Sequence, residues 1–171
     1  MTLVQLSDAD GSWSRLKNGW AQQCANVGED FGLYAQGTFV VLNELAAKSE
    51  RRAGIYAVQR GDDIPDIICQ ANTTPLPGHP EPVLRVRMVT VCPNIDFGTF
   101  GPSQYVEVLA DLFIGILQLS QQDEMAAREF KLHLRSPADF TFFQTTRKFL
   151  AAMPGFKDVS MHGAWLSVVR A

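Results

Sequence analysis

The sequence is poor in charged residues. Only 19% of its 171 residues are Asp, Glu, Lys or Arg, and 46% are hydrophobic, whereas an ordinary soluble domain has about 25% charged residues. Disorder requires low hydrophobicity and high net charge, so this composition excludes it. Lys and Arg number 15 against 18 Asp and Glu, and the chain has no basic run. The sequence therefore predicts no nucleic-acid partner.

Long apolar runs and leader-like features are also missing. The most hydrophobic segment, residues 106–119, is interrupted by Glu107, Asp111, Gly115 and Gln118. A membrane span needs about 18 or more consecutive apolar residues. The first residues lack the basic and apolar regions of a signal peptide. We therefore expect no membrane partner and a cytoplasmic location.

Cysteine pairs and known catalytic motifs are absent as well. The cysteines are Cys24, Cys69 and Cys92, and without a CxxC pair they exclude a zinc knuckle and a thioredoxin motif. They are typical of buried thiols in a reducing compartment. No metal-ligand spacing joins the histidines, so we predict no metal. GxSxG, Walker and dinucleotide-binding patterns do not occur.

Hydrophobic periodicity predicts a single α/β domain over residues 1–171, an α+β mixed sheet with the order β-α-α-β-β-β-α-β-α-β-β. The predicted helices are Ser12–Val27, Thr38–Lys48, Ser103–Gln122 and a helix that begins at Ser136 and is stopped by Pro154 and Gly155. The predicted strands are Thr2–Leu6, Ala53–Gln59, Ile64–Ala71, Val83–Cys92, Glu129–Arg135 and two more within Phe156–Val169.

Several packing details follow from the same patterns. Both faces of Val83–Cys92 are nearly apolar from Met88 on, which predicts a central strand covered on both sides. Trp13, Trp20 and Trp165 are interpreted as core or subunit-contact residues. Apolar surface beyond the needs of the core favours a homodimer. The last helix should turn one apolar face to the core, made of Phe142, Phe143, Thr146, Phe149, Leu150 and Met153.

The segment between the predicted central strand and the longest helix carries a family resemblance. Residues 91–101 read Val-Cys-Pro-Asn-Ile-Asp-Phe-Gly-Thr-Phe-Gly. With the element order, this segment resembles the phosphate loop of the GCN5-related N-acetyltransferase (acyl-CoA N-acyltransferase) superfamily. That loop runs Arg or Gln, two residues, Gly, one residue, then Gly or Ala. Gly101 matches the last position, whereas Thr99 replaces the first glycine and Asp96 replaces the Arg or Gln.

A second family feature is kept only in part. The superfamily tends to end its last crossover helix in a stretch that contains a Tyr and closes with Leu-Gly-Phe. Residues 149–156 keep Gly155 and Phe156 but have no Tyr. In the superfamily this Tyr usually protonates the departing thiolate.

The resemblance implies acetyl-CoA or another acyl-CoA as cofactor. The backbone at Val89 and Val91 would hold the pantetheine arm, and Gly98, Gly101 and Ser103 would hold the pyrophosphate. The implied function is acyl transfer to a small amine, the small-molecule partner. The departures at Asp96 and at the missing Tyr favour an alternative, a non-catalytic binding or interaction module that has lost the cofactor site.

Other polar residues allow a functional and a structural interpretation. Cys92 ends the predicted central strand, where ligands bind in open α/β sheets, and His133 is the candidate base for it. The alternatives are a buried structural thiol and a surface histidine. Arg85 and Arg87 can bind a carboxylate substrate or form an ion-pair ladder with Asp66 or nearby acids.

Three further residues belong to the substrate half that the resemblance implies. Glu44, Tyr34 and Tyr56 are candidate cleft residues there, and the sequence does not choose among them. His79, in a proline-rich connection, and His162, near a turn, are expected to be solvated.

Overall fold

The computed structural model describes residues 2–48, 50–75, 77–99 and 101–171. Its centre is a seven-stranded sheet in the order β1-β2-β3-β4-β5-β7-β6. Neighbouring strands are antiparallel, except that β4 and β5 are parallel. This confirms the predicted mixed sheet and element order. The strands are β1 (Thr2–Leu6), β2 (Ala53–Gln59), β3 (Ile67–Asn72), β4 (Val83–Val91), β5 (Glu129–His133), β6 (Phe156–His162) and β7 (Trp165–Arg170).

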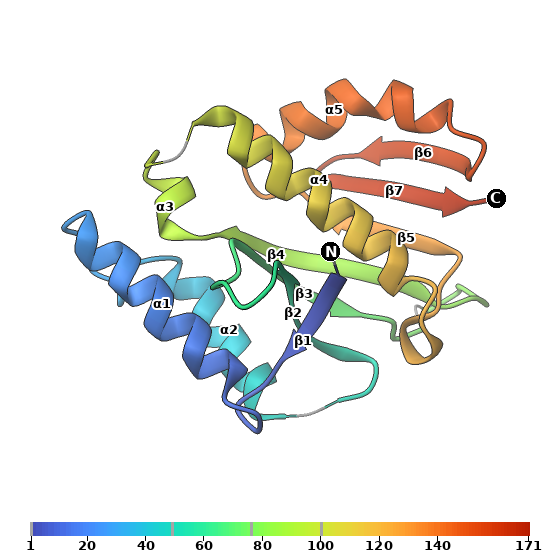
Figure 1. Ribbon diagram of the computed structural model, residues 1–171. Helices are drawn as coiled ribbons and strands as arrows, with labels where there is room; N and C mark the ends of the chain where they lie inside the picture. Colours follow the sequence, from blue (N-terminus) through green and yellow to red (C-terminus); the bar gives the residue numbers. More distant parts are fainter. Residues whose placement is uncertain (1, 49, 76, 100) are drawn as a thin grey trace.

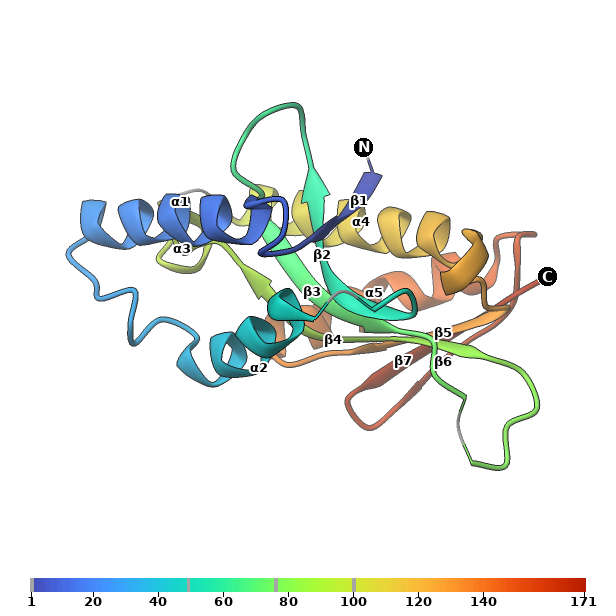
Figure 2. The ribbon, with the colours of Figure 1, turned by 90° about the horizontal axis from the view of Figure 1, so that it is seen from below.

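The helices cover the two faces of the sheet unequally. The helices α4 and α5 lie on one face, and α1 and α2 lie on the other, beside β2 to β4 (Figure 1). Seen from below, the β5, β7 and β6 side has no helix over it among the described residues (Figure 2). The helices are α1 (Ser12–Asn26), α2 (Gln36–Ala47), α3 (Pro93–Asp96), α4 (Pro102–Leu119), α5 (Pro137–Ala151) and the 3₁₀ turn η1 (Asp123–Met125).

Helix α1 forms because its apolar residues return to one side every three to four positions. Trp13, Leu16, Trp20 and Cys24 are all buried, as predicted. The Trp20 Nε1–H donates to the Pro65 carbonyl oxygen at 2.9 Å, inside the core. The carbonyl of Pro65 precedes β3, which begins at Ile67 and therefore later than the predicted Ile64.

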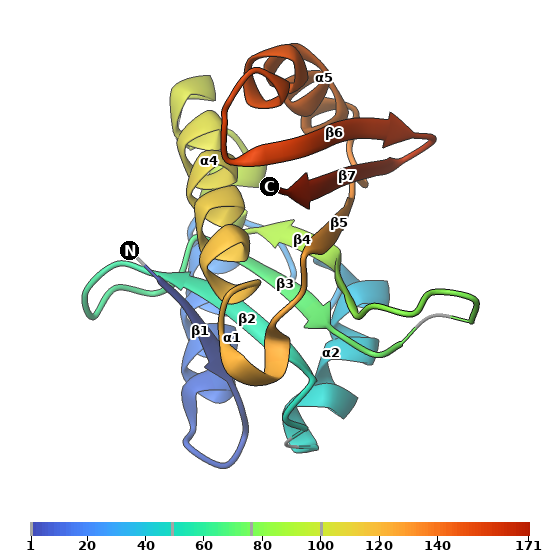
Figure 3. The ribbon, with the colours of Figure 1, turned by 90° about the vertical axis from the view of Figure 1, so that its right-hand side faces the viewer.

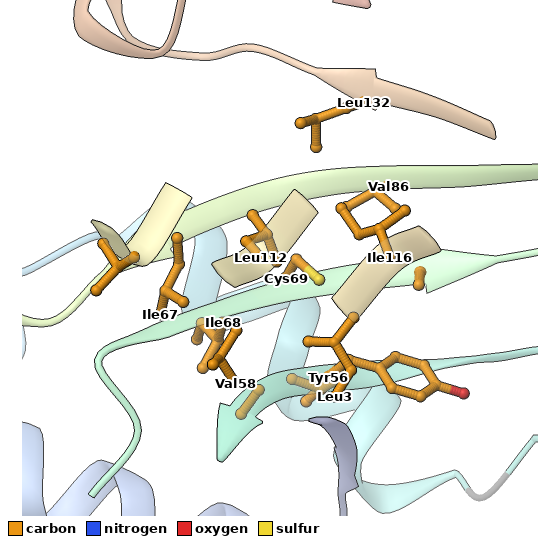
Figure 4. Packing of buried hydrophobic residues seen from close by; sticks show 14 of the residues in the cluster. Leu3, Tyr56, Val58, Ile67, Ile68, Cys69, Val86, Leu112, Ile116 and Leu132 are labelled. Carbon is orange, nitrogen blue, oxygen red and sulfur yellow. The ribbon is translucent and has the colours of Figure 1, made fainter. Parts of the chain in front are cut away.

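Helix α4 packs closely on β1. Figure 4 shows Leu112 and Ile116 among side chains from β1 to β5. Gly115 is buried, and a Cβ built on it would lie 2.7 Å from Leu3 Cγ. Gly115, which interrupts the apolar run in the sequence, therefore belongs to the buried side of the helix, where the missing side chain lets the helix approach the strand.

Helix α5 begins as its first residues predict. Ser136 Oγ accepts from the Asp139 N–H at 3.0 Å, and the Asp139 carboxylate accepts from the Ser136 N–H at 3.1 Å, a capping box. The expected apolar face is only partly correct. Phe143 is buried, but Phe149 is 71% exposed and Met153 is exposed, because the helix lies at the edge of the sheet (Figure 3).

Strand β4 changes its surroundings half-way along. It pairs with β5 only over Val83–Val86, and the register with β3 shifts between Ile68 and Gln70. At this bulge Met88 has a φ of 53°. Beyond Val86 the strand leaves β5, and residues 87–90 are half-buried or exposed, whereas Val91 is buried. The prediction of a strand covered on both sides was thus wrong for this half, because the neighbouring strand diverges.

The remaining segments agree with their predictions in outline. The expected loop after β4 contains the four-residue helix α3. Strands β6 and β7 form the predicted terminal hairpin. No helix in the described ranges is long and apolar enough to cross a membrane.

Candidate functional site

A cavity of about 760 Å³ lies where β4 diverges from β5. One wall is the segment between α1 and α2, residues 29–38, and the floor is Val89–Val91 of β4. The other walls are the end of α3, the first turns of α4 and the junction between β5 and α5. We call this cavity the gap. Its size is in the range of small-molecule sites.

The backbone of β4 is exposed to the gap. The Cys92 N–H donates to the Asp66 carbonyl at 2.7 Å, on the β3 side. Because successive residues of a strand direct their backbone groups to opposite edges, those of Val89 and Val91 point away from β3. The Tyr34 hydroxyl donates to the Val91 carbonyl at 2.6 Å, from the gap side. The edge at Val89 therefore offers the gap an N–H and a carbonyl that β5 does not pair.

A second tyrosine joins α4 to α5 at the wall of the gap. The Tyr105 hydroxyl donates to Asp139 Oδ1 at 2.5 Å and lies 3.1 Å from Ser136 Oγ. Burial, followed by the hydrogen bond to Asp139, raises the pKa of Tyr105 well above its usual value. The hydroxyl is therefore protonated at neutral pH. Burial raises the pKa of Tyr34 in the same way.

The gap has more acidic than basic side chains. Glu29, Asp30, Asp96 and Asp139 line it, and Arg135 is the cation among its lining residues. The Arg135 guanidinium donates to Thr38 Oγ1, which ties the start of α2 to the start of α5. Protein atoms partly desolvate the Asp96 carboxylate and raise its pKa, although much of the residue stays exposed. The gap therefore favours a cationic group.

The segment predicted to hold a pyrophosphate lies between α3 and α4. Gly98 has a left-handed φ of 73°, and Gly101 is the N-cap of α4 without a side-chain hydrogen bond. Free N–H groups at such a helix start are suited to an anion. The lining of the gap includes Val89 and Val91 but not Gly98, Gly101 or Ser103. Cofactor binding by all five residues stays a prediction.

The residues present fit the two ends of an acyl-CoA unequally. The unpaired backbone at Val89 suits the amide groups of a pantetheine arm, and the start of α4 suits phosphate. Two features oppose this fit. Asp96 brings a negative charge to the phosphate end, and Tyr34 already occupies the Val91 carbonyl.

Cys92 and His133 are not brought together. Cys92 Sγ lies 3.5 Å from Asp66 Oδ1, and burial raises the pKa of this thiol to about 12. The His133 ring packs 4.7 Å from the Trp165 ring. Cys92 is thus a buried thiol, as the structural interpretation had it, and the nucleophile–base pair is wrong.

The predicted ion-pair ladder of Arg85 and Arg87 is also wrong, because neither arginine pairs with an acid among the described residues. Asp66 lies 3.9 Å from Arg60, not beside Arg85 or Arg87. Arg85 contacts Thr74, and Arg87 lies over the Trp165 ring. Both arginines lie on the face of β4 opposite α4 and α5.

Of the three residues predicted to line a substrate cleft, only one lines the gap. Tyr34 lines the gap, Tyr56 is buried in β2 and Glu44 is exposed on α2. His79 and His162 are exposed, as expected. Trp13 and Trp20 are core residues, whereas Trp165 is half-buried on the helix-free side of the sheet.

Comparisons with known proteins do not assign the chain to a family. No family model and no curated protein matches the chain. A solved structure of a possible acetyltransferase from Clostridium difficile 630 is 14% identical, with 94% of this chain and 93% of that chain covered and a TM-score of 0.45. A chain of a KacTA–DNA complex is 15% identical, with 82% of each chain covered and a TM-score of 0.43.

A chain of the AtaT–AtaR complex bound to DNA is 9% identical and has a TM-score of 0.39, with 74% of this chain and 78% of that chain covered. At these values the likeness gives no role to any residue of this chain. The element order is the one on which the family resemblance rests. The chain has a mixed α/β fold built on one seven-stranded sheet.

Several polar residues of the gap carry no functional signal in the sequence, namely Glu29, Asp30, Tyr105, Arg135, Ser136 and Asp139. Tyr105 stands three residues into α4, where it reads as one apolar position among several. Arg135 appears in the sequence only as the last residue of the predicted strand Glu129–Arg135. The separation of Tyr105 from Ser136 and Asp139 in sequence, 31 and 34 residues, gives no local signal of their contact.

Proposed function

We propose that the protein is an acyl-CoA-dependent N-acyltransferase that modifies a small amine. The observation that carries the proposal is the gap, where β4 leaves its partner and exposes backbone groups at Val89 to a cavity of about 760 Å³. When bound, acyl-CoA supplies a thioester. The chain supplies the cavity, its unpaired hydrogen-bonding groups and its charge.

The acidic residues would act on the amine. Glu29 and Asp30 attract an ammonium group to the gap, and Asp96 accepts its proton. The raised pKa of Asp96 makes it a stronger base than an ordinary aspartate. The Tyr105 hydroxyl keeps its proton and lies beside Ser136. Tyr105 belongs to α4, whereas the tyrosine that the superfamily usually uses belongs to the last crossover helix.

The test is release of free thiol from acetyl-CoA in the presence of a panel of primary amines. We expect amine-dependent release, reduced about 100-fold in Asp96→Asn, with Asp62→Asn in an exposed turn as the matched control. Release should also fall as the pH is lowered, because Asp96 gains a proton above the ordinary aspartate pKa of 3.8.

The alternative is a binding module without catalysis. Tyr34 bonded to the Val91 carbonyl and the negative charge of Asp96 favour it, because both occupy positions that a cofactor would need. Absence of thiol release with every amine, together with absence of CoA binding, would overturn the enzyme proposal and favour this module.

A further inference from the structure

A groove of about 510 Å³ lies on the face of the sheet opposite α4 and α5, in the part that α1 and α2 do not cover. It crosses β4, β5, β7 and β6, and Figures 2 and 3 show this side without a helix over β5, β7 and β6. Its lining includes Arg85, Arg87, Lys131, Ser160, Trp165 and Ser167. We call these six residues the open face. They lie on the opposite side of the sheet from α4 and α5.

The strand register places these side chains in two neighbouring rows. Arg85 pairs with Lys131, and Lys131 pairs with Ser167. Arg87 lies two residues further along β4, so the two arginines are about 7 Å apart on the same side of the strand. Trp165 lies in the row of Arg87, and the Arg87 guanidinium is 5.3 Å from its ring centroid.

Both guanidiniums lack an acidic partner. Among the residues that the structure describes, neither Arg85 nor Arg87 forms an ion pair. Arg85 Nη2 bonds to Thr74, but its Nε is buried without any hydrogen-bond partner. Burial and the charge of Arg87 lower the pKa of Arg85. An anion bound between the two arginines would give Arg85 Nε an acceptor and would offset the repulsion between the two guanidiniums.

The acidic residues of the groove are already engaged. Glu129 lies 3.2 Å from Lys131 and accepts from the Ser167 hydroxyl at 2.8 Å, so it neutralises Lys131. Asp158 accepts from the Ser160 hydroxyl at 3.0 Å and lies on β6, at the far edge of the sheet. Because a hydroxyl does not neutralise Asp158, the groove has a net charge of plus one, with Arg85 and Arg87 as its cations without an acidic partner.

We propose that the open face binds the phosphate group of a small phosphate ester, with Arg85 and Arg87 as its anchors. A phosphomonoester carries nearly two negative charges near neutral pH, which matches two guanidiniums, and arginine forks bind phosphate oxygens in pairs. The groove is larger than a phosphate group, so the rest of the ligand lies along Trp165, Ser167 and Ser160. This site does not depend on the proposed acyl transfer.

The test is calorimetric titration of the full chain with ribose 5-phosphate and with inorganic phosphate, at constant ionic strength. We expect saturable binding of both, tighter for the ester, and none of ribose alone. Arg87→Gln should weaken binding by about tenfold or more, the loss of one charged hydrogen bond. Arg15→Gln, an exposed arginine of α1, is the matched control and should bind as the wild type does.

Fluorescence gives an independent readout in the same titration. Trp13 and Trp20 are 0% exposed, so a change in emission that saturates with the ligand and disappears in Trp165→Phe places the ligand in the groove. Unchanged binding by Arg87→Gln would put the anion elsewhere, for example at the start of α4, and would overturn the proposal. So would tighter binding of acetate than of phosphate, or absence of saturation at about 10 mM.

Discussion

At the scale of single residues, the gap is shaped by hydroxyl groups that tie separate segments together. Tyr34 joins the segment after α1 to β4, and Tyr105 joins α4 to the capping box of α5. Both tyrosine hydroxyls donate a hydrogen bond to a protein oxygen, and burial keeps both hydroxyls protonated. The gap therefore has fixed walls, and its charge comes from carboxylates.

The thiols supply the first residue-scale prediction. Cys24, Cys69 and Cys92 are buried, and burial raises the pKa of Cys69 and of Cys92 to about 12. At pH 8 only about one part in 10,000 of such a thiol is thiolate, the reactive form. We expect no rapid reaction with a disulfide reagent in the native state, and reaction of all three thiols in denaturant. One thiol that reacts rapidly at pH 8 would contradict this.

The close contact of Gly115 with Leu3 gives a second prediction. Gly115→Val should lower the free energy of unfolding by about 1–3 kcal/mol, because the new side chain meets Leu3 in a filled core. Chemical denaturation measures the loss. The exposed neighbour provides the control, since Ile114→Val should change stability by less than about 0.5 kcal/mol. Equal stability of the two variants would show that α4 does not press on β1.

At the scale of elements, the decisive feature is the parting of β4 and β5. The sequence predicts both strands and their crossover helix, because periodicity and turn residues are local signals. It does not predict where they separate. The bulge at Met88 looks like ordinary alternation in the sequence, and its apolar residues were therefore assigned to a covered strand. The same residues form the floor of the gap.

The capping box of α5 gives an element-scale prediction. Ser136→Ala removes the acceptor for the Asp139 N–H and a contact of Tyr105, so the free energy of unfolding should fall by about 1 kcal/mol. A shift in melting temperature of about 2–4 °C would report it. Ser14→Ala, at an exposed position of α1, should leave the melting temperature nearly unchanged. A loss of similar size in both variants would argue against the cap.

At the scale of the whole molecule, two separate surfaces carry charged residues of opposite sign. Most of the charged residues that line the gap are carboxylates, whereas the open face holds two arginines without acidic partners. Element order and the central position of β4 could be predicted, since they depend on patterns within segments. Two features could not be predicted, because they depend on how distant segments pack. They are the contact of Tyr105 with Ser136 and Asp139, and the absence of a helix over one side of β5, β7 and β6.

The most direct test of the account is calorimetric titration of the protein with acetyl-CoA. We predict saturable binding that Val89→Trp abolishes, because the larger side chain fills the floor of the gap. Val106→Trp, the same change at an exposed position of α4, should bind normally and show that the substitution itself is tolerated. Absence of binding by the wild type at millimolar acetyl-CoA, or equal binding by Val89→Trp, would contradict the assignment of the gap as the cofactor site.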